Sequence, residues 1–125
     1  MFWIPMAIGA GLVALLANGA LLLERPVPVA RVPGFAEGCV SVQDAGAQYA
    51  VQHLDVRDGQ RVLDACAAPG GKTAHLLETT NLDLLALDID TGRARRIDEN
   101  LQRLQLRAEV KVADCRSVTT WWDGQ

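Results

Sequence analysis

The sequence predicts an α/β fold, in which helices flank a parallel β-sheet as they do in Rossmann-like domains. Three short apolar runs, at residues 61–65, 82–87 and 108–114, have the length and the bounding turn residues of strands. A helix-like stretch separates each run from the next, and this alternation favours right-handed βαβ units. Ligands of such sheets bind beyond the carboxyl ends of the strands, so the residues that follow each run are the first candidates for a site.

The composition fits one domain and limits its partners. Of the 125 residues, 50% are hydrophobic and only 5% are aromatic, so aliphatic side chains would form most of the core. The net charge is −3 and no basic stripe is present. This argues against DNA as a partner and leaves at most a small RNA-binding surface on this chain. The cysteines and histidines lack the spacing of zinc ligands or of a disulfide framework, so we expect reduced thiols and no metal site.

Residues 1–23 form an uncharged apolar segment whose length would in principle suffice to span a bilayer. The segment has no basic n-region, however, and Pro5, Asn18 and several glycines interrupt it. Three interpretations stay open: a membrane or signal segment, a buried helix or strand of a larger domain, and a translated stretch unrelated to the rest. We favour the interpretations without a membrane.

Residues 24–40 are rich in proline, which disrupts regular helix and removes backbone donors, so we expect an extended connector. The third segment, residues 41–125, begins with Ser41 and has Asp44 three positions later. This capping-box pattern precedes a loose apolar stripe and predicts a helix over about residues 41–54.

The remaining elements follow in the order strand, helix, strand, helix, strand. The first strand is a short apolar run bounded by turns, which is typical of a buried strand. A helix begins just after Gly71 and precedes the second strand. Thr91 is the candidate cap of a longer helix, over residues 92–106, in which apolar residues recur at helical spacing. Residues 116–125 are predicted to form a loop.

The stretch DACAAPGGKTAH, residues 64–75, invites comparison with a phosphate-binding loop. Such a loop needs the pattern G-x-x-x-x-G-K-[ST], so that backbone N–H groups surround the phosphates. The end of the pattern fits, but Cys66 stands where the first glycine belongs and Pro69 lacks an N–H group. A P-loop-like NTPase is therefore a disfavoured alternative. The adjacent glycines, Gly70 and Gly71, also fail the dinucleotide pattern G-x-G-x-x-G.

Each predicted strand ends in or near an aspartate, namely Asp64, Asp88 and Asp114. An acid at the end of the second strand of a Rossmann-like unit typically accepts hydrogen bonds from ribose hydroxyls. Several carboxylates around one glycine turn suit a nucleoside with a positive charge better than they suit a polyphosphate. The arrangement therefore favours an adenosine-containing ligand, and the sulfonium of S-adenosylmethionine matches that description.

The stretch DACAAPGGKTAHLLE, followed by ALDID and VADC, resembles the cofactor-binding half of the RNA cytosine-5 methyltransferases. The upstream stretch PGFAEGCVSVQDAGAQ is similar to the segment that precedes it in the bacterial 16S rRNA subfamily, often called Sun or Fmu. The resemblance extends over about residues 20–125 and implies the first three strands of a Rossmann-like methyltransferase fold. It also implies S-adenosylmethionine as the cofactor, ribosomal RNA as the partner and a cytoplasmic location.

The resemblance implies a set of cofactor-binding residues. Asp88 would hold the ribose hydroxyls and Asp114 would lie near the adenine, although Asp88 could instead cap the following helix, with Asp90 the competing cap. Lys72 could serve the cofactor carboxylate, the RNA backbone or a neighbouring acid, and Asp64 could orient the glycine turn. The methionine part of the cofactor would be lined by Cys66, Ala67, Ala68, Pro69, Gly70, Gly71 and Lys72.

The resemblance places the catalytic machinery elsewhere. Methylation at C5 of cytosine needs a thiolate that adds to C6. In the family this cysteine lies in a later T-C motif, assisted by a P-C motif, and neither motif occurs in these 125 residues. We therefore assign no catalytic role to Cys39, Cys66 or Cys115. We expect a cofactor-binding fragment that is inactive alone, with residues 41–125 as the N-terminal half of the catalytic domain.

Two further expectations concern the surface of the fragment and its class. In sheets of this type the first strand pairs with the second and, on its other side, with a fourth. Without the fourth, residues 61–65 would form an exposed apolar edge that favours self-association. A non-catalytic module that binds S-adenosylmethionine or a nucleotide remains the alternative to a methyltransferase, and a protein tethered through residues 1–23 is a third, weaker one.

Overall fold

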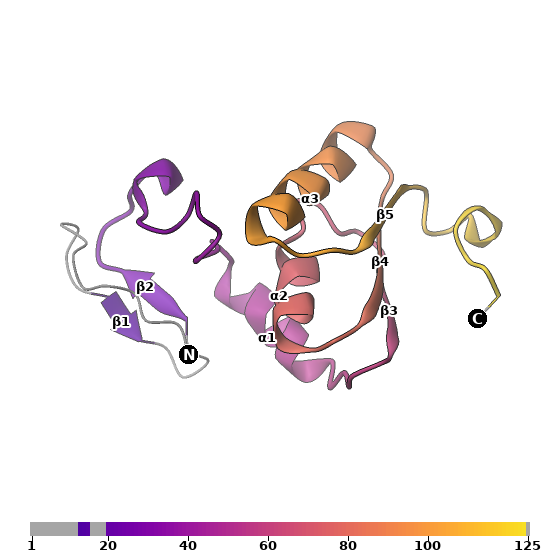
Figure 1. Ribbon diagram of the computed structural model, residues 1–125, viewed down its shortest axis with the longest axis horizontal. Helices are drawn as coiled ribbons and strands as arrows, with labels where there is room; N and C mark the ends of the chain where they lie inside the picture. The colour runs from indigo at the N-terminus through magenta and orange to yellow at the C-terminus, as the bar shows by residue number, and fades with distance from the viewer. Residues whose placement is uncertain (1–12, 16–19, 125) are drawn as a thin grey trace.

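The computed structural model describes residues 13–15 and 20–124 (Figure 1). Strands β1 (Val13–Leu15) and β2 (Leu21–Leu23) form an antiparallel hairpin in which Val13 is opposite Leu23. Residues 1–12 and 16–19 of the apolar segment are outside the described residues. Within the described part of the chain, no helix has the length and apolar character that a membrane crossing needs.

A separate three-stranded sheet holds the centre of the molecule. Strands β3 (Arg61–Asp64), β4 (Asp83–Asp88) and β5 (Glu109–Val112) are parallel and lie in the order β3-β4-β5. The predicted α/β fold is thus confirmed, and among the described strands β3 lies at the edge that was expected for it. All three strands end on the same side of the sheet, where Asp64 lies beside Ala86, and Asp88 beside Val112.

Three helices cover one face of this sheet, and the C-terminal segment lies on the other (Figure 1). They are α1 (Ala45–His53), α2 (Gly71–Thr79) and α3 (Thr91–Leu104). The core forms where alternate residues of β4, Leu84 and Ala86, meet Ile97 and Leu101 of α3. Ile97 has no exposed surface, and burial of a side chain of its size contributes about 1.5–3 kcal/mol. This packing fixes the start of α3 next to the end of β4.

The opposite face of the sheet is only partly covered. The prediction that residues 61–65 form a buried strand is wrong, because helices cover one face only and β3 lies at an edge; Leu63 is 39% exposed. The predicted C-terminal loop contains a 3-10 helix, η2 (Val118–Thr120). Arg61 of β3 connects this segment to the sheet. Its Nη2 lies 2.8 Å from Oδ2 of Asp123 in the C-terminal segment, and its Nε lies 3.1 Å from Oδ2 of Asp83 in β4.

Helix α1 begins later than predicted, and of the caps considered for α3 the structure selects Asp90. Helix α1 begins at Ala45 rather than near residue 41, because the carboxylate of Asp44 accepts the N–H of Gly46 at 2.8 Å. Helix α3 is capped by Asp90, whose Oδ1 accepts the N–H of Arg93 at 2.7 Å, whereas Thr91 is its first residue. In both cases the aspartate next to the helix caps it. Asp88 is therefore not the cap of α3.

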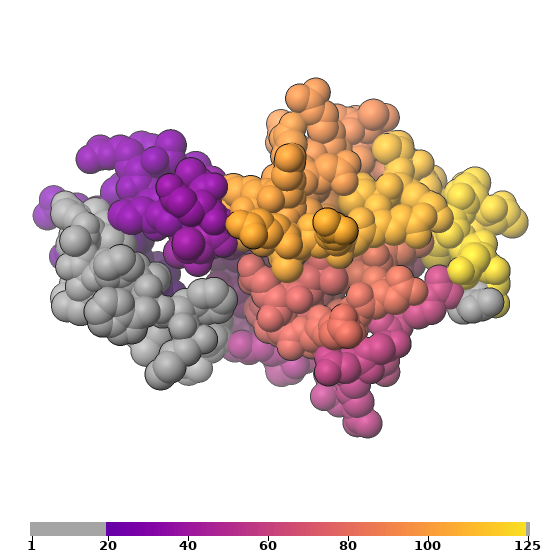
Figure 2. All heavy atoms as spheres, in the orientation of Figure 1, coloured from indigo at the N-terminus to yellow at the C-terminus, as the bar shows by residue number. Residues whose placement is uncertain are grey.

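The proline-rich segment is folded against α3 rather than fully extended. Residues Val29–Arg31 form a 3-10 helix, η1. Arg103 holds the following turns: its Nη1 donates to the carbonyls of Phe35 (2.7 Å) and Val40 (2.9 Å), and its guanidinium lies 4.0 Å from the centre of the Phe35 ring. Figure 2 shows this purple segment against the orange end of α3. A little further along the chain, Gln43 lies beside Gly71, where a Cβ atom would be 3.9 Å from its side chain.

Candidate functional site

Residues 65–70 connect β3 to α2 at the carboxyl end of the sheet, and hydrogen bonds tie this glycine turn to β4. The N–H of Ala67 donates to the carbonyl of Leu87 at 2.9 Å, and the N–H of Gly70 donates to the carbonyl of Ala67 at 2.6 Å. Ala67 is buried, whereas Cys66 and Pro69 are exposed. The turn therefore presents a fixed backbone at the place where Rossmann-like sheets bind their ligands.

Gly70 is required by both its conformation and its surroundings. Its φ of 95° lies in the left-handed region, which glycine adopts without strain. A Cβ atom at this position would lie 3.3 Å from Cγ2 of Ile97, so a side chain would push α3 away. The glycine thus allows α3 to pack directly against the start of α2.

Asp64 and Thr73 form a hydrogen bond beneath the turn. The hydroxyl of Thr73, which has no exposed surface, donates to Oδ2 of Asp64 at 2.7 Å. Asp64 thus orients the first turn of α2, whereas the role expected for it was to orient the glycine turn itself. In a P-loop the corresponding hydroxyl would bind a metal ion beside the phosphates. Here it is turned toward a carboxylate, which argues further against an NTPase.

Asp88, at the end of β4, is 1% exposed and is held by several groups. Its Oδ1 accepts the N–H of Asp90 at 3.1 Å, and its Oδ2 accepts the N–H of Ala68 at 3.3 Å. Arg93 forms an ion pair with it, with Nη2 3.2 Å from Oδ2. The structure therefore brings Asp88 and the glycine turn together, as the sequence predicted.

Asp114 lies beyond the end of β5 and pairs with its near neighbour Arg116. The two side chains approach to 2.6 Å, and the backbone N–H of Arg116 also donates to Oδ1 at 2.9 Å. These hydrogen bonds from Arg116 lower the pKa of Asp114 to about 2. Arg116 thus shares the carboxylate that the sequence assigned to the adenine side of the ligand.

Lys72 and the cysteines are open to solvent. Lys72 is exposed and, in the described part of the chain, has no carboxylate within ion-pair distance. Cys39, Cys66 and Cys115 are free thiols on the surface. Among the described residues, no group of three His, Cys, Asp or Glu side chains could hold a metal ion.

Two residues near the site were missed by the sequence reasoning. The Nε2 atom of Gln43 is buried without a hydrogen-bond partner and lies 3.9 Å from where a Cβ of Gly71 would be. Arg93, which pairs with Asp88, also lies 3.8 Å from the sulfur of Cys66. Gln43 belongs to the stretch VQD that carried part of the resemblance, and this was the available signal. No such signal marked Arg93, apart from its place in the first turn of α3, five residues after Asp88.

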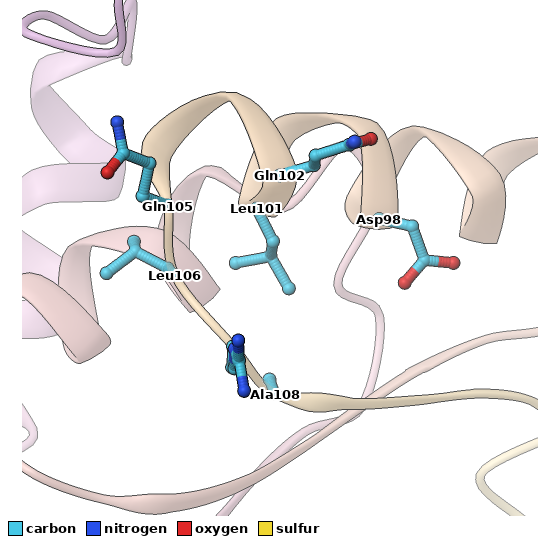
Figure 3. Close-up of a pocket in the computed structure, with 7 residues that line it drawn as sticks. Asp98, Leu101, Gln102, Gln105, Leu106 and Ala108 are labelled. Carbon is cyan, nitrogen blue, oxygen red and sulfur yellow. The ribbon is translucent and has the colours of Figure 1, made fainter.

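A hollow elsewhere on the protein contains none of these residues. It lies between the last turns of α3 and the chain that leads into β5, at the amino ends of the strands (Figure 3). The glycine turn lies at the opposite, carboxyl end of the sheet. The hollow is lined by Asp98, Leu101, Gln102, Gln105, Leu106, Arg107 and Ala108.

Residues 51–125 match the family model of the 16S rRNA methyltransferase RsmB/F. The chain belongs to this family. The ribosomal RNA small subunit methyltransferase B of Vibrio cholerae is 53% identical over 110 residues, and the enzyme of the same name from Pseudomonas putida is 48% identical over 120 residues. These matches cover 87% and 94% of this chain, so the family predicted from the glycine turn and its flanking strands is confirmed.

Solved structures share the fold of this chain. The crystal structure of PH0851 matches with a TM-score of 0.80 at 29% identity, over 87% of this chain and 26% of that one. NSun6 from Pyrococcus horikoshii, crystallised with SFG, matches with a TM-score of 0.66 at 26% identity, over 83% of this chain and 29% of that one. The chain spans about a quarter of the length of the curated relatives named above, 25% and 27%.

Proposed function

We propose that this chain is the cofactor-binding part of an S-adenosylmethionine-dependent 16S rRNA cytosine-5 methyltransferase. The observation that carries the proposal is the meeting of Asp88 with the glycine turn at the carboxyl end of the sheet. Membership of the RsmB/F family supports the reaction class. The SFG in the similar NSun6 structure is an S-adenosylmethionine analogue and supports the cofactor.

The residues of the site fit this cofactor chemically. Carboxylates accept hydrogen bonds from ribose hydroxyls and tolerate a nearby sulfonium, whereas they repel a polyphosphate. Asp88 would hold the ribose, and Asp114 would lie on the adenine side. The methionine part would be lined by Cys66, Ala67, Ala68, Pro69, Gly70, Gly71 and Lys72. When bound, the cofactor supplies the methyl group.

In this proposal the chain binds and orients the methyl donor but does not supply the nucleophile. A cytosine-5 methyltransferase needs a thiolate that adds to C6, and the T-C and P-C motifs that carry it are absent from the 125 residues. RNA would then be recognised mainly by other parts of the enzyme, which agrees with the net charge of −3. A cytoplasmic location and the absence of a DNA partner belong to the same proposal.

A non-catalytic module that binds S-adenosylmethionine is the second candidate, and the missing motifs are the observation that favours it. A methyl-transfer assay on 16S rRNA separates the candidates when it is made with a hybrid chain, in which residues 20–125 replace the matching segment of a family enzyme that contains the motifs. We expect that chain to transfer the methyl group to cytosine C5 and the 125-residue chain not to. Turnover by the 125 residues alone would contradict the proposal that this chain binds the methyl donor but does not supply the nucleophile.

Calorimetric titration with S-adenosylhomocysteine tests the cofactor site itself. We expect saturable binding by the 125-residue chain and no binding of ATP with Mg²⁺. Asp88→Asn should weaken the binding at least tenfold, because it replaces a carboxylate that accepts hydroxyl donors by an amide. Asp83→Asn, at the amino end of the same strand, is the matched control and should bind normally. Equal binding by wild type and Asp88→Asn would contradict the assigned role.

A further inference from the structure

The guanidinium of Arg93 stands between two parts of the proposed cofactor site. Its Nη2 lies 3.2 Å from Oδ2 of Asp88, at the end of β4, and 3.8 Å from the sulfur of Cys66, in the turn that follows β3. Asp88 is proposed to bind ribose, and Cys66 begins the segment proposed to line the methionine part. A ligand that contacts both parts must therefore meet Arg93.

Asp88 cannot be reached by a ligand in the arrangement that the structure shows, because its side chain is only 1% exposed. A ribose hydroxyl can donate to the carboxylate only after one of the groups around it has moved. Two of these groups are the backbone N–H groups of Ala68 and Asp90, which belong to the glycine turn and to the start of α3. Their displacement would disrupt the packing of the turn on the sheet.

Arg93 is the group that can move without such disruption. Its side chain is 50% exposed and reaches Asp88 from the first turn of α3, so rotation about its own bonds can take the guanidinium away from the carboxylate. Half exposure also means that the freed guanidinium returns to water, where its charge is well solvated. The ion pair with Asp88 is thus a contact that a ligand can replace.

We propose that Arg93 determines the affinity of the site by competing with the ribose hydroxyls for Asp88. In the ligand-free protein the guanidinium neutralises the carboxylate and covers it. An adenosine-containing ligand binds when Arg93 has swung away, and the lost ion pair reduces the observed affinity. This inference rests on the proposed function, since it assumes that Asp88 receives a ribose.

A purely structural ion pair would behave differently from a competing one. Removal of a structural partner would loosen the end of β4 and weaken ligand binding. Removal of a competitor leaves a buried carboxylate without a counter-charge, which lowers the stability of the free protein but makes the site more receptive to hydroxyl donors and to a cation. Stability and affinity then change in opposite directions, and this opposition is the signature of the proposal.

The test compares Arg93→Met with Arg95→Met in the 125-residue chain. Arg95 pairs with Glu99 on the outer surface of the same helix, with Nε 2.9 Å from Oε1, and is the matched control. Calorimetry with S-adenosylhomocysteine should show binding about three- to tenfold tighter for Arg93→Met and unchanged for Arg95→Met. The melting temperature of ligand-free Arg93→Met should be lower, and its rise at saturating ligand larger, than in wild type.

The possible outcomes separate this inference from the proposed function. If wild type binds and Arg93→Met binds equally or more weakly, Arg93 is not a competitor, although the cofactor site stands. If neither binds S-adenosylhomocysteine, both the proposed function and the inference are wrong. Binding by Arg93→Met alone would support the inference strongly. Should Arg93→Met fail to fold by circular dichroism, Arg93→Gln, which keeps a polar group of shorter reach, gives the same comparison.

Discussion

The hydroxyl of Thr73 donates a 2.7 Å hydrogen bond to the carboxylate of Asp64, and this contact ties the first turn of α2 to the end of β3. The pair lies directly beneath the glycine turn, whose other side is held by β4 through Ala67. The turn is thus fixed from two strands at once. A fixed turn is what a ligand site needs, because backbone groups held in place are not reorganised when the ligand binds.

Substitution of Thr73 should reveal how much this contact stabilises the fold. Thr73→Val keeps the shape but leaves Asp64 without its donor, so we expect the free energy of unfolding to fall by about 1–3 kcal/mol. Urea denaturation measures the change. The control is Thr79→Val, because Thr79 lies on the exposed end of the same helix and donates only to backbone carbonyls of its own turn. An equal fall in the free energy of unfolding at both positions would show that the hydrogen bond to Asp64 adds no more stability than a hydrogen bond to the backbone.

Gly70 offers a second test of the turn, with an unusually close control. Gly70→Ala places a Cβ at a positive φ and 3.3 Å from Ile97, whereas Gly59→Ala places one at a φ of 81° with no atom within 4 Å. Both variants should lose about 1–2 kcal/mol from the left-handed conformation. Gly70→Ala should lose more, because α3 must also shift, and the excess in urea denaturation measures that contact. An equal loss in the free energy of unfolding for both variants would mean that α3 shifts without a cost in stability.

The strands and the glycine turn could be predicted because both depend on local signals. Apolar runs between turn residues mark the strands, and the alternation with helices dictates a parallel arrangement. Asp88 followed from its place at the end of a strand. The exact helix starts could not be predicted, because Ser41 and Asp44, or Thr91 and Asp90, are all acceptable caps and only the path of the chain selects one.

The contacts between segments that are distant in the chain could not be predicted from the sequence either. Arg103 holds the turns at Phe35 and Val40, and Arg93 reaches the carboxylate of Asp88 and the sulfur of Cys66. No periodic pattern in the sequence indicates which distant residue a long arginine side chain will contact. The half-exposed face of β3 was missed for a related reason, since an apolar run shows that a strand is suited to burial but not which of its faces a helix covers.

The ion pair of Asp114 gives a pH-dependent prediction. Arg116 lowers the pKa of Asp114 from 3.8 to about 2, so the pair adds stability that is fully present above about pH 4 and is lost as the pH falls toward 2. Arg116→Gln should raise the pKa of Asp114 toward 3.8 and remove the part of this contribution that the guanidinium supplies, while the backbone N–H of residue 116 still donates to Oδ1. NMR titration of the side-chain carboxyl carbons measures the pKa directly. Arg95→Gln, which breaks the surface pair with Glu99, should leave Asp114 unchanged.

The edge of the sheet at β3 predicts self-association of this chain. In the described residues β3 pairs only with β4, and Leu63 on its open face is 39% exposed, near Trp122, which is 54% exposed. A strand that pairs on one side only and has an apolar face can pair with the same strand of a second copy. We therefore expect concentration-dependent dimers or larger species in sedimentation velocity experiments at micromolar protein.

Leu63→Lys tests whether this edge is responsible. A charge on the open face of β3 should abolish the association, because pairing of two copies would then place like charges together away from water. Leu22→Lys is the control, since Leu22 is 59% exposed but belongs to the separate hairpin. If wild type sediments as a monomer at all concentrations, the edge is protected in some other way. If Leu22→Lys is the variant that dissociates the oligomer, the hairpin and not β3 forms the contact.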